Sequence, residues 1–202
     1  MIGRNESLAK AIALITSTSG AKVAILGESG VGKTALALSI LQHDDMIKSF
    51  GSHRYFVPCD SMEDPGQLIT GILQIMGKDT TDPQTTISPL VKMQNLLSVS
   101  GNIFIVLDHF ESLMNLKTPN AHLALTRIME VLSMPSVTVI LTIAGQYAPN
   151  IVNWNARIRL EPFDDALSLL KQAADDVILR NKLLLDFEMS SVSEEIPSVV
   201  TP

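Results

Sequence analysis

The chain has 202 residues, of which 46% are hydrophobic and 18% charged, a composition that excludes an intrinsically disordered chain and fits one folded domain. The net charge of −6 comes without a basic cluster, which disfavours nucleic acid as a partner. No apolar run approaches the roughly 20 residues of a membrane span, no secretory signal is present, and the single Cys59 suits a reducing compartment, so we expect a cytoplasmic protein with no membrane partner.

Hydrophobic periodicity and turn residues predict helices that alternate with strands along the chain. The predicted helices cover residues 7–16, 35–42, 64–76, 89–97, 121–132 and 164–174. The predicted strands cover residues 22–26, 53–59, 102–108, 137–143 and, at an edge of the sheet, 156–160. Continuous apolar strands are typical of a parallel sheet that is buried on both faces. The alternation therefore predicts an α/β fold, a doubly wound, mostly parallel sheet with helices on both faces.

A phosphate-binding loop joins the first predicted strand to the helix that follows it. Residues 27–34 form a complete G-x-x-x-x-G-K-[ST] motif, in which backbone N–H groups and a helix N-terminus converge on phosphate oxygens. In this motif Lys33 reaches the β- and γ-phosphates and the Thr34 hydroxyl binds Mg²⁺. A chance match at a structural glycine turn is the alternative, and the flanking strand and helix disfavour it. The predicted nucleotide contacts in this segment are Gly27, Glu28, Ser29, Gly30, Val31, Gly32, Lys33, Thr34 and Ala35.

The apolar strand at 102–108 ends in an acid, which is the Walker B pattern. Because ligands of open α/β sheets bind at the carboxyl ends of the strands, Asp108 is predicted to hold Mg²⁺ opposite Thr34. Many P-loop ATPases place a second acid directly after the first, and here that position is His109. Glu111 is the nearest replacement, although an acid is also favoured in the first turn of a helix. The predicted catalytic residues are Lys33, Asp108 and Glu111.

A family resemblance rests on the phosphate-binding loop and on three other segments, Ile2-Gly3-Arg4-Asn5-Glu6, residues 50–61 and residues 105–111. On these segments the chain resembles the NB-ARC-type P-loop NTPase domain of STAND ATPases. The likeness is closest to fungal NLR-like proteins and covers about residues 1–175. It implies ATP or ADP with Mg²⁺ as cofactors, adenine contacts from Ile2, Gly3 and Arg4, and a three-layer P-loop NTPase fold. It also implies a signalling switch in which ADP holds a closed form and ATP permits opening and self-association of the full-length protein.

Two departures from the family pattern bear on catalysis. Ala144 stands where the family usually carries an arginine that senses the γ-phosphate, and His109 replaces the second acid. We therefore expect slow or no ATP hydrolysis, unless Arg157, Arg159 or a neighbouring protomer supplies the missing charge. The alternatives to a switch are a conventional P-loop ATPase and a nucleotide-free scaffold that keeps only the fold.

The C-terminal segment has a different composition from the rest of the chain. Residues 190–198 are rich in serine and acidic residues, and Glu195-Ile196-Pro197 is at best a degraded match to the Gly-x-Pro motif of similar proteins. We expect residues 1–175 to form the nucleotide-binding domain. Residues 176–202 are expected to be the truncated start of a following helical subdomain or a disordered tail.

Overall fold

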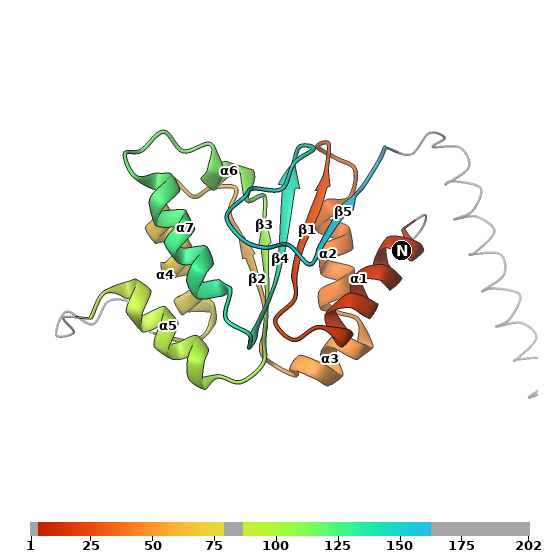
Figure 1. Cartoon of the computed structure of the whole chain (residues 1–202), viewed down its shortest axis with the longest axis horizontal. Coiled ribbons are helices and arrows are strands. Elements are labelled where there is room, and N and C mark those ends of the chain that lie inside the picture. The colour runs from red at the N-terminus through yellow and green to blue at the C-terminus, as the bar shows by residue number, and fades with distance from the viewer. Residues whose placement is uncertain (1–3, 79–86, 163–202) are drawn as a thin grey trace, which may run out of the picture. The chain divides into compact units, whose positions relative to one another are not determined.

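A computed structural model of the chain describes residues 4–78 and 87–162 and places a five-stranded sheet between two layers of helices (Figure 1). The sheet order is β2-β3-β4-β1-β5, and every pairing in it is parallel. The strands are β1 (Lys22–Gly27), β2 (Arg54–Pro58), β3 (Ile103–Asp108), β4 (Val137–Ala144) and β5 (Ala156–Arg159). The predicted parallel sheet is confirmed, and β5 lies at an edge as expected.

The order of the strands fixes where a ligand can bind. β1 lies between β4 and β5, so that the chain crosses over two strands on its way from β1 to β2. The strand order therefore reverses beside β1, and the carboxyl ends of β1, β3 and β4 lie at the same edge of the sheet. Open parallel sheets bind ligands in the crevice at such a switch point.

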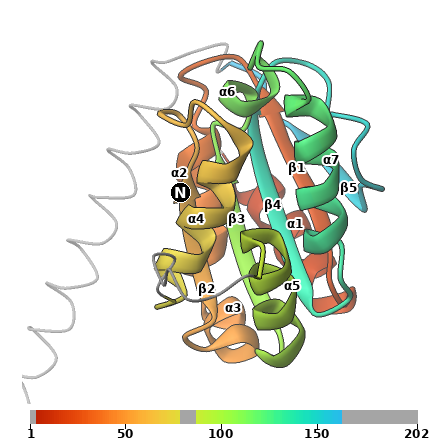
Figure 2. The same cartoon turned by 90° about the vertical axis from the view of Figure 1, so that its left-hand side faces the viewer.

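The two faces of the sheet are covered by different sets of helices. One layer consists of α1 (Asn5–Ser17), α2 (Lys33–Leu41) and α3 (Asp44–Phe50). The other, which faces the viewer in Figure 2, consists of α4 (Pro65–Ile75), α5 (Pro89–Val99), α6 (Glu111–Met114) and α7 (Ala121–Leu132). Successive residues of β4 contribute to opposite cores, Val139 to the α4–α5–α7 side and Ile140 to the α1–α2 side. This double burial explains why the strands are apolar throughout.

Local capping explains where α4 and α5 begin. The Asp64 side chain accepts hydrogen bonds from the backbone N–H of Gly66 at 2.6 Å and of Gln67 at 3.2 Å, and Pro65 occupies the first turn, where its missing N–H costs nothing. Ser88 caps α5 in the same way, with its hydroxyl accepting from Val91 N at 3.4 Å. The start of a helix at Asp64-Pro65 is therefore confirmed.

Two helices of the structure were not predicted. α3 is a seven-residue helix capped by His43, whose Nδ1 accepts from Asp45 N at 3.3 Å, and α6 is a single turn. Both are too short to show a helical period in the sequence. The predicted helix at 164–174, the domain end at 175 and the tail lie outside the described residues. In the described parts of the chain, no helix is long and apolar enough to cross a bilayer.

Candidate nucleotide-binding site

The loop between β1 and α2 is built by three glycines with positive φ. Gly27, Gly30 and Gly32 have φ of 149°, 82° and 94°. A Cβ on Gly27 would lie 2.5 Å from the carbonyl oxygen of Leu160, so this glycine lets the loop start tightly against the end of β5. A Cβ on Gly30 or Gly32 would meet nothing within 4 Å, which shows that open space lies above the loop at both positions.

The backbone of the loop fits a polyphosphate. Within the described residues, the N–H groups of Ser29, Gly30 and Gly32 donate no hydrogen bond to another protein group. They precede the N-terminus of α2, whose dipole favours negative charge. Unpaired donors, a helix N-terminus and open space above two glycines form an anion-binding site, so these residues suit the phosphates of the expected nucleotide.

Lys33 is the first residue of α2, directly after the phosphate-binding loop. Its side chain is largely buried, with 6% of the residue exposed. Its Nζ donates to the carbonyl oxygens of Gly27 at 3.0 Å and Glu28 at 2.7 Å. These neutral acceptors hold the ammonium beside the phosphate-facing backbone without forming an ion pair. A positive charge is therefore in place at the loop for an anionic ligand.

Thr34 and Asp108 meet across the site, as the two motifs predict. The Thr34 hydroxyl lies 3.0 Å from each carboxylate oxygen of Asp108, which is only 3% exposed. Mg²⁺ in nucleotide sites is held by one or two side chains together with phosphate oxygens and water. Thr34 and Asp108 could supply the protein ligands of such an ion. In the described residues no cluster of three His, Cys, Asp or Glu side chains forms a metal cage.

The Asp108 carboxylate is oriented by two further residues. The Thr142 hydroxyl, fully buried on β4, donates to Asp108 Oδ1 and accepts from the backbone N–H of His109 at 2.9 Å. His109 adopts a left-handed conformation with φ of 55°, and its Nδ1 lies 3.0 Å from Asp108 Oδ2. Sequence analysis missed the role of Thr142; a threonine near the carboxyl end of an apolar strand was the available signal, and Thr138 in the same strand shares the residue type without the role.

Glu111 joins α6 to the end of β4. Its Oε2 accepts from the backbone N–H of Ala144 at 2.9 Å. The residue proposed as a replacement acid and the residue at the expected sensor position are thus in direct contact. One Glu111 oxygen is engaged in that contact, and its role in catalysis stays a prediction.

Arg4 connects the start of α1 to the phosphate-binding loop. Its Nη2 donates to the carbonyl oxygens of Val31 at 3.1 Å and Glu161 at 2.6 Å. Partial burial lowers the pKa of the guanidinium, and the nearby Glu161 carboxylate opposes this shift. Arg4 therefore lies at the nucleotide loop, while Ile2 and Gly3 lie outside the described residues. The predicted adenine contacts of these three residues stay predictions.

With this geometry in place, the comparisons with known proteins decide the family. The family model of the NACHT domain matches residues 21–166. The chain belongs to the NACHT domain family. No curated protein sequence matches the chain. The broader part of the expected resemblance, a STAND-related P-loop NTPase domain, is thereby confirmed, whereas the NB-ARC type and the likeness to fungal proteins stay predictions.

Solved structures confirm the fold of this NACHT domain. The ORC1 protein of Aeropyrum pernix in complex with DNA superposes with a TM-score of 0.66 at 19% identity, over 87% of this chain and 50% of that one. The ORC2 protein of the same organism, with ADPNP and ADP, gives 0.56 at 18% identity, over 79% and 47%. Drosophila ORC bound to DNA gives 0.61 at 15% identity, over 96% and 51%. The NACHT domain thus spans about half of each chain and shares its P-loop NTPase fold.

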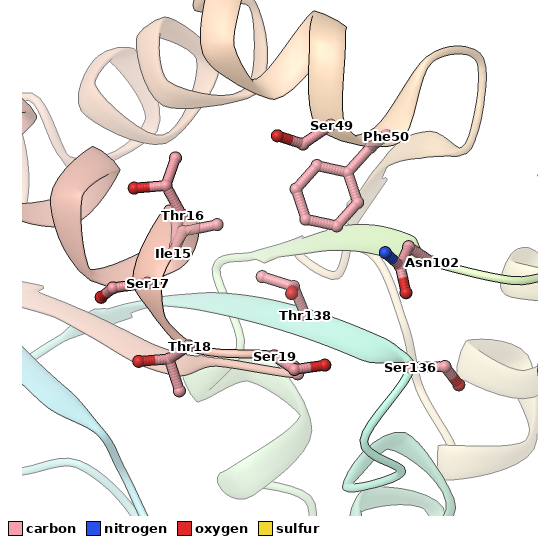
Figure 3. Close-up of a pocket in the computed structure, with 11 residues that line it drawn as sticks. Ile15, Thr16, Ser17, Thr18, Ser19, Ser49, Phe50, Asn102, Ser136 and Thr138 are labelled. Atoms are coloured by element: carbon pink, nitrogen blue, oxygen red, sulfur yellow. The ribbon is translucent and has the colours of Figure 1, made fainter.

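Two hollows of the NACHT domain differ in what they could bind. A cavity of about 340 Å³ beside the phosphate-binding loop is lined by Gly27, Glu28, Ser29, residues 144–146 and residues 159–161. A second hollow of about 220 Å³ lies at the opposite edge of the sheet, where the strands begin (Figure 3). Its lining is rich in hydroxyl groups, including Ser49 and Thr138, and contains no charged side chain among the described residues. Of these two hollows, only the first adjoins the phosphate-binding loop.

Proposed function

We propose that this NACHT domain is the ADP/ATP-binding switch domain of a STAND, NLR-like signalling regulator. The proposal is carried by two features that lie together. The phosphate loop is open and has unpaired N–H groups at Ser29, Gly30 and Gly32, and Thr34 contacts Asp108 across from it. Bound Mg²⁺ would neutralise phosphate charge between these two side chains. The likeness of the Ile2-Gly3-Arg4 segment to the adenine-side segment of the family supports adenine as the base, and Arg4 lies beside the loop at Val31.

Slow or absent hydrolysis is part of the proposal. Ala144 brings no cation to the end of β4, and preorganised charge at the transferring phosphate is the largest contribution of such sites. One oxygen of the Glu111 carboxylate already accepts from Ala144 N, and His109 hydrogen-bonds Asp108 through Nδ1. Glu111 therefore keeps only one carboxylate oxygen for an attacking water, and His109 offers no carboxylate. A conventional ATPase would instead hydrolyse many ATP molecules per chain, and its rate per chain would not change with protein concentration.

A switch needs a nucleotide that binds its two states with different affinity. We propose that ADP holds the closed form and that ATP permits opening and self-association in the full-length protein, where further subdomains supply the differential contacts. Nucleic acid is not a proposed partner, because the chain carries a net charge of −6.

Thermal unfolding with added nucleotide tests the binding proposal. Mg²⁺–ADP and Mg²⁺–ATP should raise the melting temperature progressively, since a ligand at 100 times its Kd adds about 2.7 kcal/mol of stability. Lys33→Ala should abolish the rise. Lys48→Ala is the matched control, because the Lys48 side chain on α3 is 76% exposed and far from the loop in sequence. Absence of a shift at millimolar nucleotide, or a shift of equal size with GTP, would overturn the proposal.

A further inference from the structure

The cavity beside the phosphate-binding loop is lined by a basic side chain that the family pattern does not anticipate. Its lining brings together the start of the loop at Glu28 and Ser29, the end of β4 at Ala144, and Arg159 at the end of β5. Arg159 is the only basic side chain among the described residues that line it. The other two charged residues of the described lining, Glu28 and Glu161, are acidic, so Arg159 is the lining residue that can attract an anion.

The register of the sheet fixes where the Arg159 guanidinium lies. Arg159 pairs with Leu26, the residue before the first glycine of the loop, and Leu160 N donates to Leu26 O at 2.8 Å. β5 and β4 flank β1 on opposite sides. Arg159 Nη2 nevertheless donates to the carbonyl oxygen of Gln146, just beyond β4, at 3.0 Å. The side chain therefore reaches across the carboxyl end of β1, where the phosphate-binding loop begins.

We propose that Arg159 contacts the terminal phosphate of ATP within its own chain and gives the site its preference for triphosphate over diphosphate. The inference rests on the proposed nucleotide-binding function. A guanidinium has five N–H donors in a planar fork that matches phosphate oxygens, and the Gln146 carbonyl engages only part of that fork. Arg159 thereby brings a positive charge from β5 to the terminal phosphate, while the position after Asp108 still holds His109 in place of a second acid, so hydrolysis stays slow.

Arg157 provides a matched control on the same strand. It is exposed like Arg159 and lies on the same face of β5, because residues two apart in a strand point the same way. It lines the neighbouring hollow with Tyr147 and Asn150 but not the cavity at the loop. Loss of either arginine removes one exposed positive charge from β5, and only Arg159 touches the loop cavity.

Calorimetric titration with Mg²⁺–ADP and with a non-hydrolysable Mg²⁺–ATP analogue tests the inference. Arg159→Gln should weaken the triphosphate by about 10-fold or more, since hydrogen bonds to charged groups are the strong ones, and leave ADP within about 2-fold. Arg157→Gln should change neither. The double variant Ala144→Arg with Arg159→Gln should recover the preference for triphosphate, because the charge returns at the neighbouring strand end.

The outcomes separate the two claims. Equal weakening of both nucleotides by Arg159→Gln, or no change in either, overturns the role of Arg159 while ADP binding by the wild type keeps the proposed function. Failure of the wild type to bind either nucleotide overturns both. The melting temperature of each variant without nucleotide shows whether an altered affinity reflects a damaged fold.

Discussion

Replacement of Thr142 by valine isolates the contact that orients Asp108. Thr142 is fully buried, and its hydroxyl donates to Asp108 Oδ1 and accepts from His109 N. Valine keeps the shape and removes both hydrogen bonds. A hydrogen bond to a charged group contributes about 1.5–3 kcal/mol, and a buried polar group left without a partner costs about 1–3 kcal/mol. Because the two contacts share one hydroxyl, we expect a loss of roughly 2–4 kcal/mol in the free energy of unfolding.

Urea denaturation measures this loss, with Thr138→Val as the matched control. Thr138 lies four residues earlier on the same face of β4, is 2% exposed and makes no side-chain hydrogen bond within the described residues. Its replacement should change the free energy of unfolding by less than about 1 kcal/mol. Thr142→Val should also weaken nucleotide binding more in the presence of Mg²⁺ than in its absence. An equal effect of the two substitutions on stability would refute the reasoning.

Three further predictions concern stability and reactivity. Burial lowers the pKa of Lys22 to about 8. Above that pH the unfolded chain binds more protons than the folded one, so the free energy of unfolding should rise by about 2 kcal/mol between about pH 7.5 and 9.5. Lys22→Met should flatten this rise, whereas Lys48→Met should not. The Cβ of Gly27→Ala would lie 2.5 Å from Leu160 O, whereas the Cβ of Gly51→Ala would have no atom within 4 Å and would only strain a positive φ. Gly27→Ala should therefore lower the melting temperature more than Gly51→Ala, and equal losses would contradict this. Burial, with the nearby Asp108, raises the pKa of Cys59 to about 12, so iodoacetamide should label Cys59 at about pH 8 only in denaturant, and rapid labelling of the native protein would contradict its burial.

Local sequence patterns were enough to locate the phosphate loop and the Asp108 strand. Gly27 to Thr34 is a contiguous motif whose backbone conformation depends mainly on its own glycines, and strand 102–108 is apolar because both of its faces are covered. The contact of Thr34 with Asp108 followed from these two motifs, since both end at the same edge of a parallel sheet.

The contacts that sequence analysis missed depend on which strands lie side by side. Thr142 orients Asp108 because β4 pairs with β3, and Arg159 reaches Gln146 because β5 and β4 flank β1. Lateral strand order is set by packing over the whole sheet, and a single sequence does not encode it in a local pattern. Arg159 was considered as one source of the missing charge, but only the sheet order places it beside the phosphate loop of its own chain.

Native mass spectrometry of the protein in an equimolar mixture of ADP, ATP, GDP and GTP with Mg²⁺ tests the central claim most directly, because the mass of the complex identifies the ligand and its stoichiometry. We predict one adenine nucleotide per chain for the wild type and for Lys48→Ala, and the unliganded mass for Lys33→Ala. A wild-type chain that stays unliganded at millimolar nucleotide, that takes guanine nucleotides equally, or that keeps its ligand after Lys33→Ala would contradict the account.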